Sequence, residues 1–168
     1  MDGATVRPEF LRGISIFEGL APAMIEKLAS TLEVRRCEPG APLFKEGDES
    51  QELFIVLSGE LEVMKRSRRG RDARIAVVGM GDSIGEMSIV DDQPRSASVR
   101  AVSPSQLMRL GADDLARLAE TDLRAYATIL HNVAREISRR LRVADGIIAD
   151  FVAQVWDAYL APSATTKR

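Results

Sequence analysis

The chain has 168 residues, a formal net charge of −2, one cysteine and one histidine. This length suits one structural domain with a sizeable core, and the near-neutral charge gives no general attraction to nucleic acid or to an anionic membrane. A single cysteine, Cys37, excludes an intramolecular disulfide, and with only His131 beside it we expect no metal site. No signal-like N-terminal segment or apolar run of 18 residues is present, so we expect a soluble cytoplasmic protein.

Residues 1–33 are expected to form N-terminal helices at the periphery of the domain. Phe10, Leu11, Ile14 and Phe17 are spaced to share one helical face. A second helix is expected near residues 22–32, because Pro22 suits a first turn.

Residues 34–111 have a different pattern, in which short apolar or alternating runs are separated by glycines. Turn signals recur roughly every 8–12 residues, which is typical of a small antiparallel barrel or roll. We therefore expect an α+β fold, mainly β, built on an antiparallel β-roll or jelly roll. A strongly basic hairpin loop is expected at residues 65–74, and we interpret it as solvated, with contact to an acidic partner as the alternative. The predicted strands are residues 42–44, 53–57, 61–64, 75–78, 97–99 and 106–110.

Residues 112–161 return to a helical pattern, followed by a tail at residues 162–168. Asp113 or Asp114 is expected to cap a short helix that ends near Glu120. Thr121 or Asp122 is expected to begin a much longer helix.

The long helix carries an apolar seam with alternating spacings of four and three residues over about four heptads. Such a helix is longer than one small domain can cover, so we expect it to pair with a second copy through residues 122–160; packing on its own core is the alternative. Gly146 costs roughly 1 kcal/mol in mid-helix and is a candidate bend. The seam consists of Leu130, Ala134, Ile137, Leu141, Ala144, Ile148, Phe151, Val155 and Ala158.

The most informative segment is residues 85–97. It places a carboxylate, Glu86, directly after Gly85 and an arginine, Arg95, nine residues later, followed by a hydroxyl and a small residue. A carboxylate can accept hydrogen bonds from a ribose hydroxyl, and a guanidinium can bind a phosphate with two parallel hydrogen bonds. If the two converge, they form a receptor site for a small anionic nucleotide.

From about Phe17 to Val155 the chain resembles the cyclic-nucleotide-binding domain family, most closely the sensor half of catabolite-activator proteins. The resemblance rests on residues 43–48 (LFKEGD), 53–63 (LFIVLSGELEV), 81–88 (GDSIGEMS), 94–99 (PRSASV) and 139–143 (RRLRV). Residues 82–99 correspond to the family's phosphate-binding cassette. A single Gly-Glu or Arg-Ser-Ala is a weak signal, but both in order on a glycine-rich roll are specific.

The resemblance implies a cyclic mononucleotide, cAMP or cGMP, as the ligand. It implies that Glu86 accepts from the ribose 2′-hydroxyl, Arg95 pairs with the cyclic phosphate, and Ser96 donates to phosphate or base. Main-chain amides of the cassette complete the site. The expected ligand-binding residues are Gly85, Glu86, Met87, Ser88, Arg95, Ser96, Ala97 and Asp145.

The long helix departs from the catabolite-activator pattern where that pattern has two hydroxyl residues facing adenine. Here the positions hold Ala144 and Asp145. Asp145 can accept from the amino group of adenine or from two N–H groups of guanine, so the base stays open; a solvated helix flank is the alternative. We interpret the basic cluster of Arg135, Arg139, Arg140 and Arg142 as a solvated flank as well.

We expect a stand-alone cyclic nucleotide receptor, since no helix-turn-helix follows residue 160, and we expect it to signal to an unidentified partner protein. A metal-dependent enzyme on a related roll would need several histidines, so we do not expect an enzyme. An interaction module that has lost nucleotide binding is the main alternative.

Overall fold

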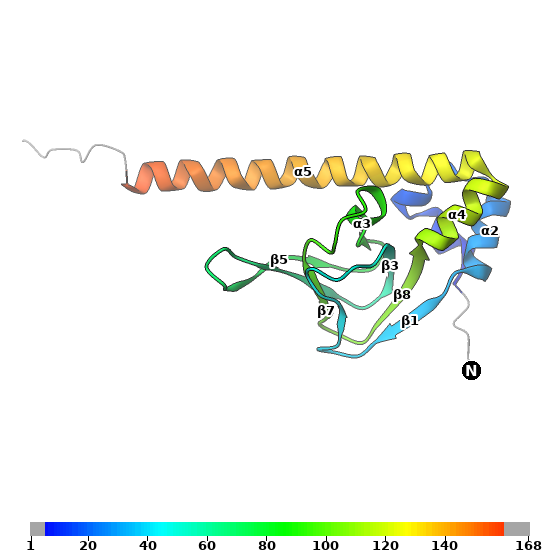
Figure 1. The fold of residues 1–168 in the computed structure, drawn as a ribbon, viewed down its shortest axis with the longest axis horizontal. Coiled ribbons are helices and arrows are strands. Elements are labelled where there is room, and N and C mark those ends of the chain that lie inside the picture. The colour runs from blue at the N-terminus through cyan, green and yellow to red at the C-terminus, as the bar shows by residue number, and fades with distance from the viewer. Residues whose placement is uncertain (1–5, 160–168) are drawn as a thin grey trace, which may run out of the picture.

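The computed structural model describes residues 6–159, with side chains to residue 157. Its centre is a roll of two four-stranded antiparallel sheets, ordered β1-β8-β3-β6 and β2-β7-β4-β5 (Figure 1). The expected α+β, mainly β fold is therefore confirmed. The strands are β1 (Val34–Cys37), β2 (Pro42–Phe44), β3 (Glu52–Ser58), β4 (Leu61–Arg66), β5 (Asp72–Val78), β6 (Ser83–Ile84), β7 (Ser98–Ala101) and β8 (Ser105–Gly111).

Each of the six predicted runs coincides with a strand, but two strands were missed. β1 is the polar sequence VRRC, and β6 has only two residues, so neither carries an apolar alternation. The predicted loop at residues 65–74 was too long, because β4 extends to Arg66 and β5 begins at Asp72. The connecting turn is residues 67–71.

Two apolar cores lie on opposite faces of β3. Leu53 and Ile55 are fully buried in the core shared with the helices, and Phe54 and Val56 are equally buried inside the roll. A strand covered on both faces needs a continuous apolar run rather than an alternating one, which explains residues 53–57.

The helices lie on one side of the roll and include α1 (Pro8–Arg12), the 3-10 turn η1 (Ser15–Phe17), α2 (Pro22–Thr31), α3 (Met87–Val90), α4 (Ala112–Thr121) and α5 (Leu123–Tyr159). The Asp122 carboxylate accepts from the amide of Ala125 at 2.9 Å and caps α5, as expected. Asp114 takes part in the cap of α4, as expected, but from inside the helix. Gly111 is the N-cap, and the Asp114 carboxylate accepts from its amide at 2.9 Å.

The long helix α5 crosses the roll and continues well beyond it (Figure 1). Its first half buries Ala125, Ile129 and Val133, whereas residues 141–157 are exposed throughout. The helix passes through Gly146 without interruption. Among the described residues, no helix combines the length and apolarity needed to cross a bilayer.

We predict opposite effects for alanine at two glycines. Gly59, in the β3–β4 turn, has φ +88°, and a Cβ there would lie 2.5 Å from the Pro104 carbonyl oxygen. Gly59→Ala should lower the free energy of unfolding by more than about 2 kcal/mol, because left-handed strain adds to a backbone clash. Gly146→Ala, on an open helical face, should raise it by about 1 kcal/mol. Urea unfolding at one fixed protein concentration checks both.

Candidate functional site

Two loops bring the predicted carboxylate and arginine to the same end of the roll. Glu86 follows β6 and precedes α3, and Arg95 lies between α3 and β7. Gly85 allows this approach: its φ is +83°, and a Cβ there would lie 2.5 Å from Nη1 of Arg95 and 2.6 Å from the Glu52 carbonyl oxygen. Only glycine fits this position without moving the arginine.

The guanidinium of Arg95 is buried and held from several sides. Nη1 donates to the carbonyl oxygens of Glu52 at 2.7 Å and Gly85 at 3.1 Å and to Oγ of Ser88 at 2.9 Å. Nε donates to Oγ of Ser50 at 2.9 Å. Arg95 is only 3% exposed, so these bonds fix the direction of the remaining nitrogen, Nη2.

Nearby groups compensate part of the cost of burying this cation. The guanidinium lies over the ring of Phe44, 4.0 Å from its centroid, and Nη2 is 3.9 Å from a carboxylate oxygen of Glu52. Burial lowers the pKa of Arg95 from its usual value, and the negative charges of Glu52, Asp48 and Glu86 oppose this effect.

One polar atom on each of the two key side chains lacks a hydrogen-bond partner among the described residues. Oε2 of Glu86 and Nη2 of Arg95 are both buried and make no hydrogen bond. A buried, unsatisfied polar group costs about 1–3 kcal/mol, and more when it is charged. A ligand that supplies a hydroxyl donor to the first atom and an anionic oxygen to the second would remove both costs.

Arg140 is a site residue that the sequence analysis missed. It was interpreted as part of a solvated flank, but it is half-buried, and Nη1 donates to Oε1 of Glu86 at 2.8 Å. Its Nη2 donates to the carbonyl oxygen of Ser83 in β6. Behind it, Glu136 is 8% exposed and accepts from Arg139 at 2.6 Å and from Arg140 at 3.2 Å. The helix α5 is therefore attached directly to the cassette carboxylate.

The other expected ligand-binding residues lie in different surroundings. Ser88 is buried below Arg95 and uses its hydroxyl to hold it. Ala97 is buried beside the cassette, and the exposed Ser96 hydroxyl lies 3.6 Å from the sulfur of Met87. Asp145 is exposed on the distal part of α5, and no hydrogen bond or ion pair joins it to the described residues.

A second missed contact ties the cassette to β4. Nζ of Lys65 donates to the carbonyl oxygen of Ser96 and to Oε1 of Glu46, the latter at 2.6 Å. The hydrogen bond from Lys65 lowers the pKa of Glu46, and the amide of Arg66 adds to this effect. Lys65 had been assigned to a solvated loop, so its position in a strand was needed to find this contact.

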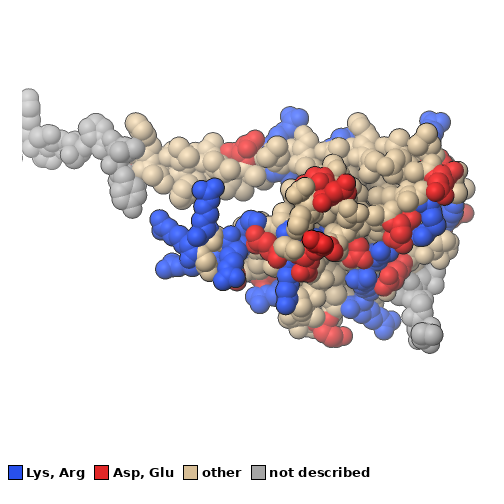
Figure 2. All heavy atoms as spheres, viewed as in Figure 1, with Lys and Arg blue, Asp and Glu red and all other residues tan. Residues whose placement is uncertain are grey.

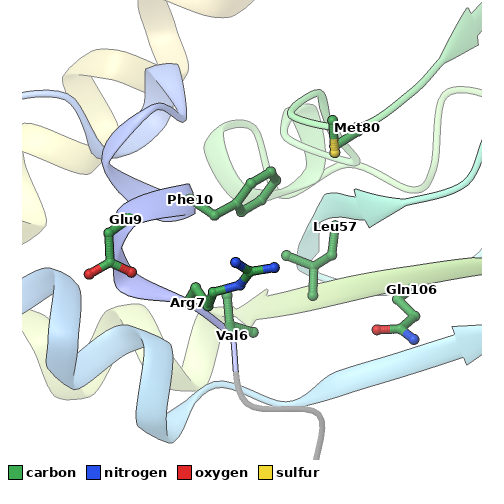
Figure 3. Close-up of a pocket in the computed structure, with 7 residues that line it drawn as sticks. All are labelled: Val6, Arg7, Glu9, Phe10, Leu57, Met80 and Gln106. Carbon is green, nitrogen blue, oxygen red and sulfur yellow. The ribbon is translucent and has the colours of Figure 1, made fainter.

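A cavity of the described residues lies elsewhere. It has a volume of about 530 Å³ and lies between α1 and the ends of β3 and β8, where Phe10, Leu57 and Met80 line it (Figure 3). Lysine and arginine side chains gather on the projecting β4–β5 hairpin (Figure 2). Within residues 6–159, no group of three or more His, Cys, Asp or Glu side chains is arranged to hold a metal ion.

Glu136 should make the free energy of unfolding decrease at acidic pH. Hydrogen bonds from Arg139 lower its pKa below the ordinary 4.5, so its contribution is complete above that value and is lost as the pH falls through the folded-state pKa. Glu136→Gln should cost about 1–3 kcal/mol in the free energy of unfolding at pH 7, and the difference from wild type should shrink below about pH 4. Urea unfolding at a series of pH values measures this, with exposed Glu120→Gln as the control. If the difference in the free energy of unfolding between Glu136→Gln and wild type does not change with pH, this assignment is contradicted.

Comparisons with known proteins agree with this geometry. The family described as "Cyclic nucleotide-binding domain" matches residues 34–122. The "Cyclic AMP receptor protein" of Thermus thermophilus is 35% identical over 135 residues, 80% of this chain and 61% of the relative. A "cAMP-dependent protein kinase regulatory subunit" of Mycosarcoma maydis is 29% identical over 136 residues, 80% of this chain but 24% of that protein.

Solved structures give the same result. A cyclic nucleotide-binding domain from Methylobacillus flagellatus superimposes with a TM-score of 0.76 and 29% identity, covering 84% of this chain and 80% of that one. The chain spans about three fifths of the length of the Thermus receptor. With the family matched over more than half of its residues and the roll reproduced, the chain belongs to the cyclic nucleotide-binding domain family.

Proposed function

We propose that this protein is a receptor for a cyclic mononucleotide, cAMP or cGMP, and that it signals to another protein through α5. The observation that carries the proposal is the pair of buried, unpartnered atoms, Oε2 of Glu86 and Nη2 of Arg95. One is an acceptor and the other a donor, as the ribose hydroxyl and the phosphate of a cyclic nucleotide require. Relatives named for cAMP support the ligand class.

The expected contacts have sufficient strength. The ribose 2′-hydroxyl donates to Glu86, the phosphate accepts from Arg95, and Ser96 with the amides of Gly85 and Ala97 adds donors. Each hydrogen bond to a charged group contributes about 1.5–3 kcal/mol. Two or three such bonds with burial of the base reach about −8 kcal/mol, which is micromolar affinity.

Arg140 provides a route from this site to α5. Arg140 already binds one oxygen of Glu86. A ligand that binds the other oxygen would change the charge distribution and the position of the carboxylate that Arg140 contacts. A ligand shifts a conformational equilibrium only by its different affinities for the two states. Contact with Glu86 supplies such a difference between a docked and a released α5.

The distal half of α5 supports a homodimer through residues 122–160. Leu141, Ile148 and Phe151 are about 60% exposed and share one seam, whereas Leu130 and Ile137 at the other end pack on the protein's own core. An apolar stripe of this length is normally covered, and a second α5 has the matching spacing. Asp145 borders this seam and stays a proposed contact to the base. The seam's Ala158 lies outside the described side chains.

An interaction module without nucleotide binding is the alternative function. Burial of charged groups is costly, and a module that binds no nucleotide would gain nothing from a buried Arg95 and Glu86 that each keep one polar atom without a hydrogen bond. The expected cytoplasmic location suits either function.

Arg95→Lys should weaken binding of both cAMP and cGMP by at least about 100-fold in calorimetry, because a lysine cannot reproduce the guanidinium's planar donors. Arg100→Ala is the control, since Arg100 lies on neighbouring β7 and pairs with Glu62. Circular dichroism shows whether each variant is folded. Unchanged micromolar affinity in a folded Arg95→Lys variant would refute the site, and no binding by wild type would refute the receptor.

Ile148→Glu should convert a dimer into a monomer at tens of micromolar protein, because it places a charge in the proposed seam. Ala153→Glu, on the opposite side of the same exposed helix, should leave the dimer intact. Sedimentation velocity with and without nucleotide measures both. A wild-type monomer under all conditions would refute the seam.

A further inference from the structure

Lys65 of β4 is a cation whose position in the strand faces the inside of the roll. In β4, Leu61 is fully buried and Val63 packs on the roll core, so alternate residues of this strand point inward. Lys65 is the next residue in that series. Its side chain therefore leaves β4 on the same face as the core residues, although it is 45% exposed.

Small side chains surround Lys65. It pairs with Ala73 of β5, and Val63 pairs with Ala76. On the other side, β4 pairs Met64 with Ser98, which brings Lys65 next to Ala97 of the cassette. The neighbours of Lys65 on the two adjacent strands, Ala73 and Ala97, are therefore both small residues.

The ammonium group reaches the cassette itself. Nζ donates to the carbonyl oxygen of Ser96, the residue directly after Arg95, and to Oε1 of Glu46. An ammonium group has three hydrogens and no acceptor. Two hydrogens are used by these contacts, and one is available to a ligand.

The groups on the ligand determine which acceptor the third N–H of Lys65 can bind. In the proposed function, Glu86 takes the ribose hydroxyl and Arg95 the phosphate, so only the base is left for Lys65. Guanine presents two neighbouring acceptors, N7 and O6, whereas adenine presents N7 beside an amino donor. A donor-only group therefore favours guanine.

We propose that Lys65 is a specificity-determining residue that binds the N7/O6 edge of guanine and makes this receptor prefer cGMP to cAMP. The proposal rests on the proposed function, because it assumes that ribose and phosphate are held by Glu86 and Arg95. It differs from a purely structural role, in which Lys65 only fixes the carbonyl of Ser96. A structural role would affect every nucleotide equally.

Calorimetry of wild type, Lys65→Met and Lys65→Arg with cGMP, cAMP and cyclic IMP separates these roles. Cyclic IMP keeps N7 and O6 but lacks the amino group that Asp145 or Ser96 would recognise. Lys65→Met should weaken cGMP and cyclic IMP binding about tenfold or more, which is one charged hydrogen bond, and cAMP binding much less. Lys65→Arg should keep the preference. Lys45→Met, at an exposed lysine of the adjacent β2–β3 loop, is the matched control.

The outcomes are distinct. An equal loss for all three nucleotides in Lys65→Met, or no preference for cGMP in wild type, overturns the assignment of Lys65 and leaves the receptor standing. Wild type that binds none of the three nucleotides refutes the receptor itself. Thermal unfolding of each variant shows that a loss of affinity is not a loss of fold.

Discussion

The structure of the site depends on burying one guanidinium. Arg95 is almost completely removed from water, and four main-chain or hydroxyl oxygens, one aromatic ring and one carboxylate compensate for its burial. Those partners fix the short α3 segment, the left-handed Gly85 and the start of β3 relative to one another. The direction of the remaining nitrogen, Nη2, is consequently fixed. A preorganised donor of this kind binds an anion without a further loss of side-chain entropy.

Glu86 links this anchor to the rest of the molecule because its two oxygens have different tasks. One is bound by Arg140 of α5, and the other is unpartnered. Burying a carboxylate with only one cationic partner is expensive, so the site gains when a ligand donates to the second oxygen. The Glu86 side chain thus contacts α5 through one oxygen and offers the other oxygen to a ligand.

The sequence was sufficient for the roll, the neighbourhood of Glu86 and Arg95, and the long helix, because each follows from local patterns: glycine spacing, the order of the two charged residues in one short segment, and the heptads. It was insufficient where a contact joins distant segments. Arg140 looked like a solvated cation because Glu136 and Asp145 lie beside it in sequence, while its main partner is 54 residues away. Lys65 lies in an arginine-rich run of the sequence, and only its place in β4 shows that its side chain contacts the cassette.

The two halves of α5 are under different physical constraints, and Arg140 lies at their junction. Residues before it are held by the protein's own core, with Asn132 donating to the carbonyl oxygens of Ile16 and Glu18. Residues after it have no cover among the described residues, although they include Leu141, Ile148 and Phe151. A stiff helix that is anchored at the cassette on one side of this junction, and covered by a second chain on the other side as proposed, would transmit a small change at the junction over its full length. The proposed ligand contact at Glu86 therefore lies where a change of one hydrogen bond would alter the geometry of the proposed dimer.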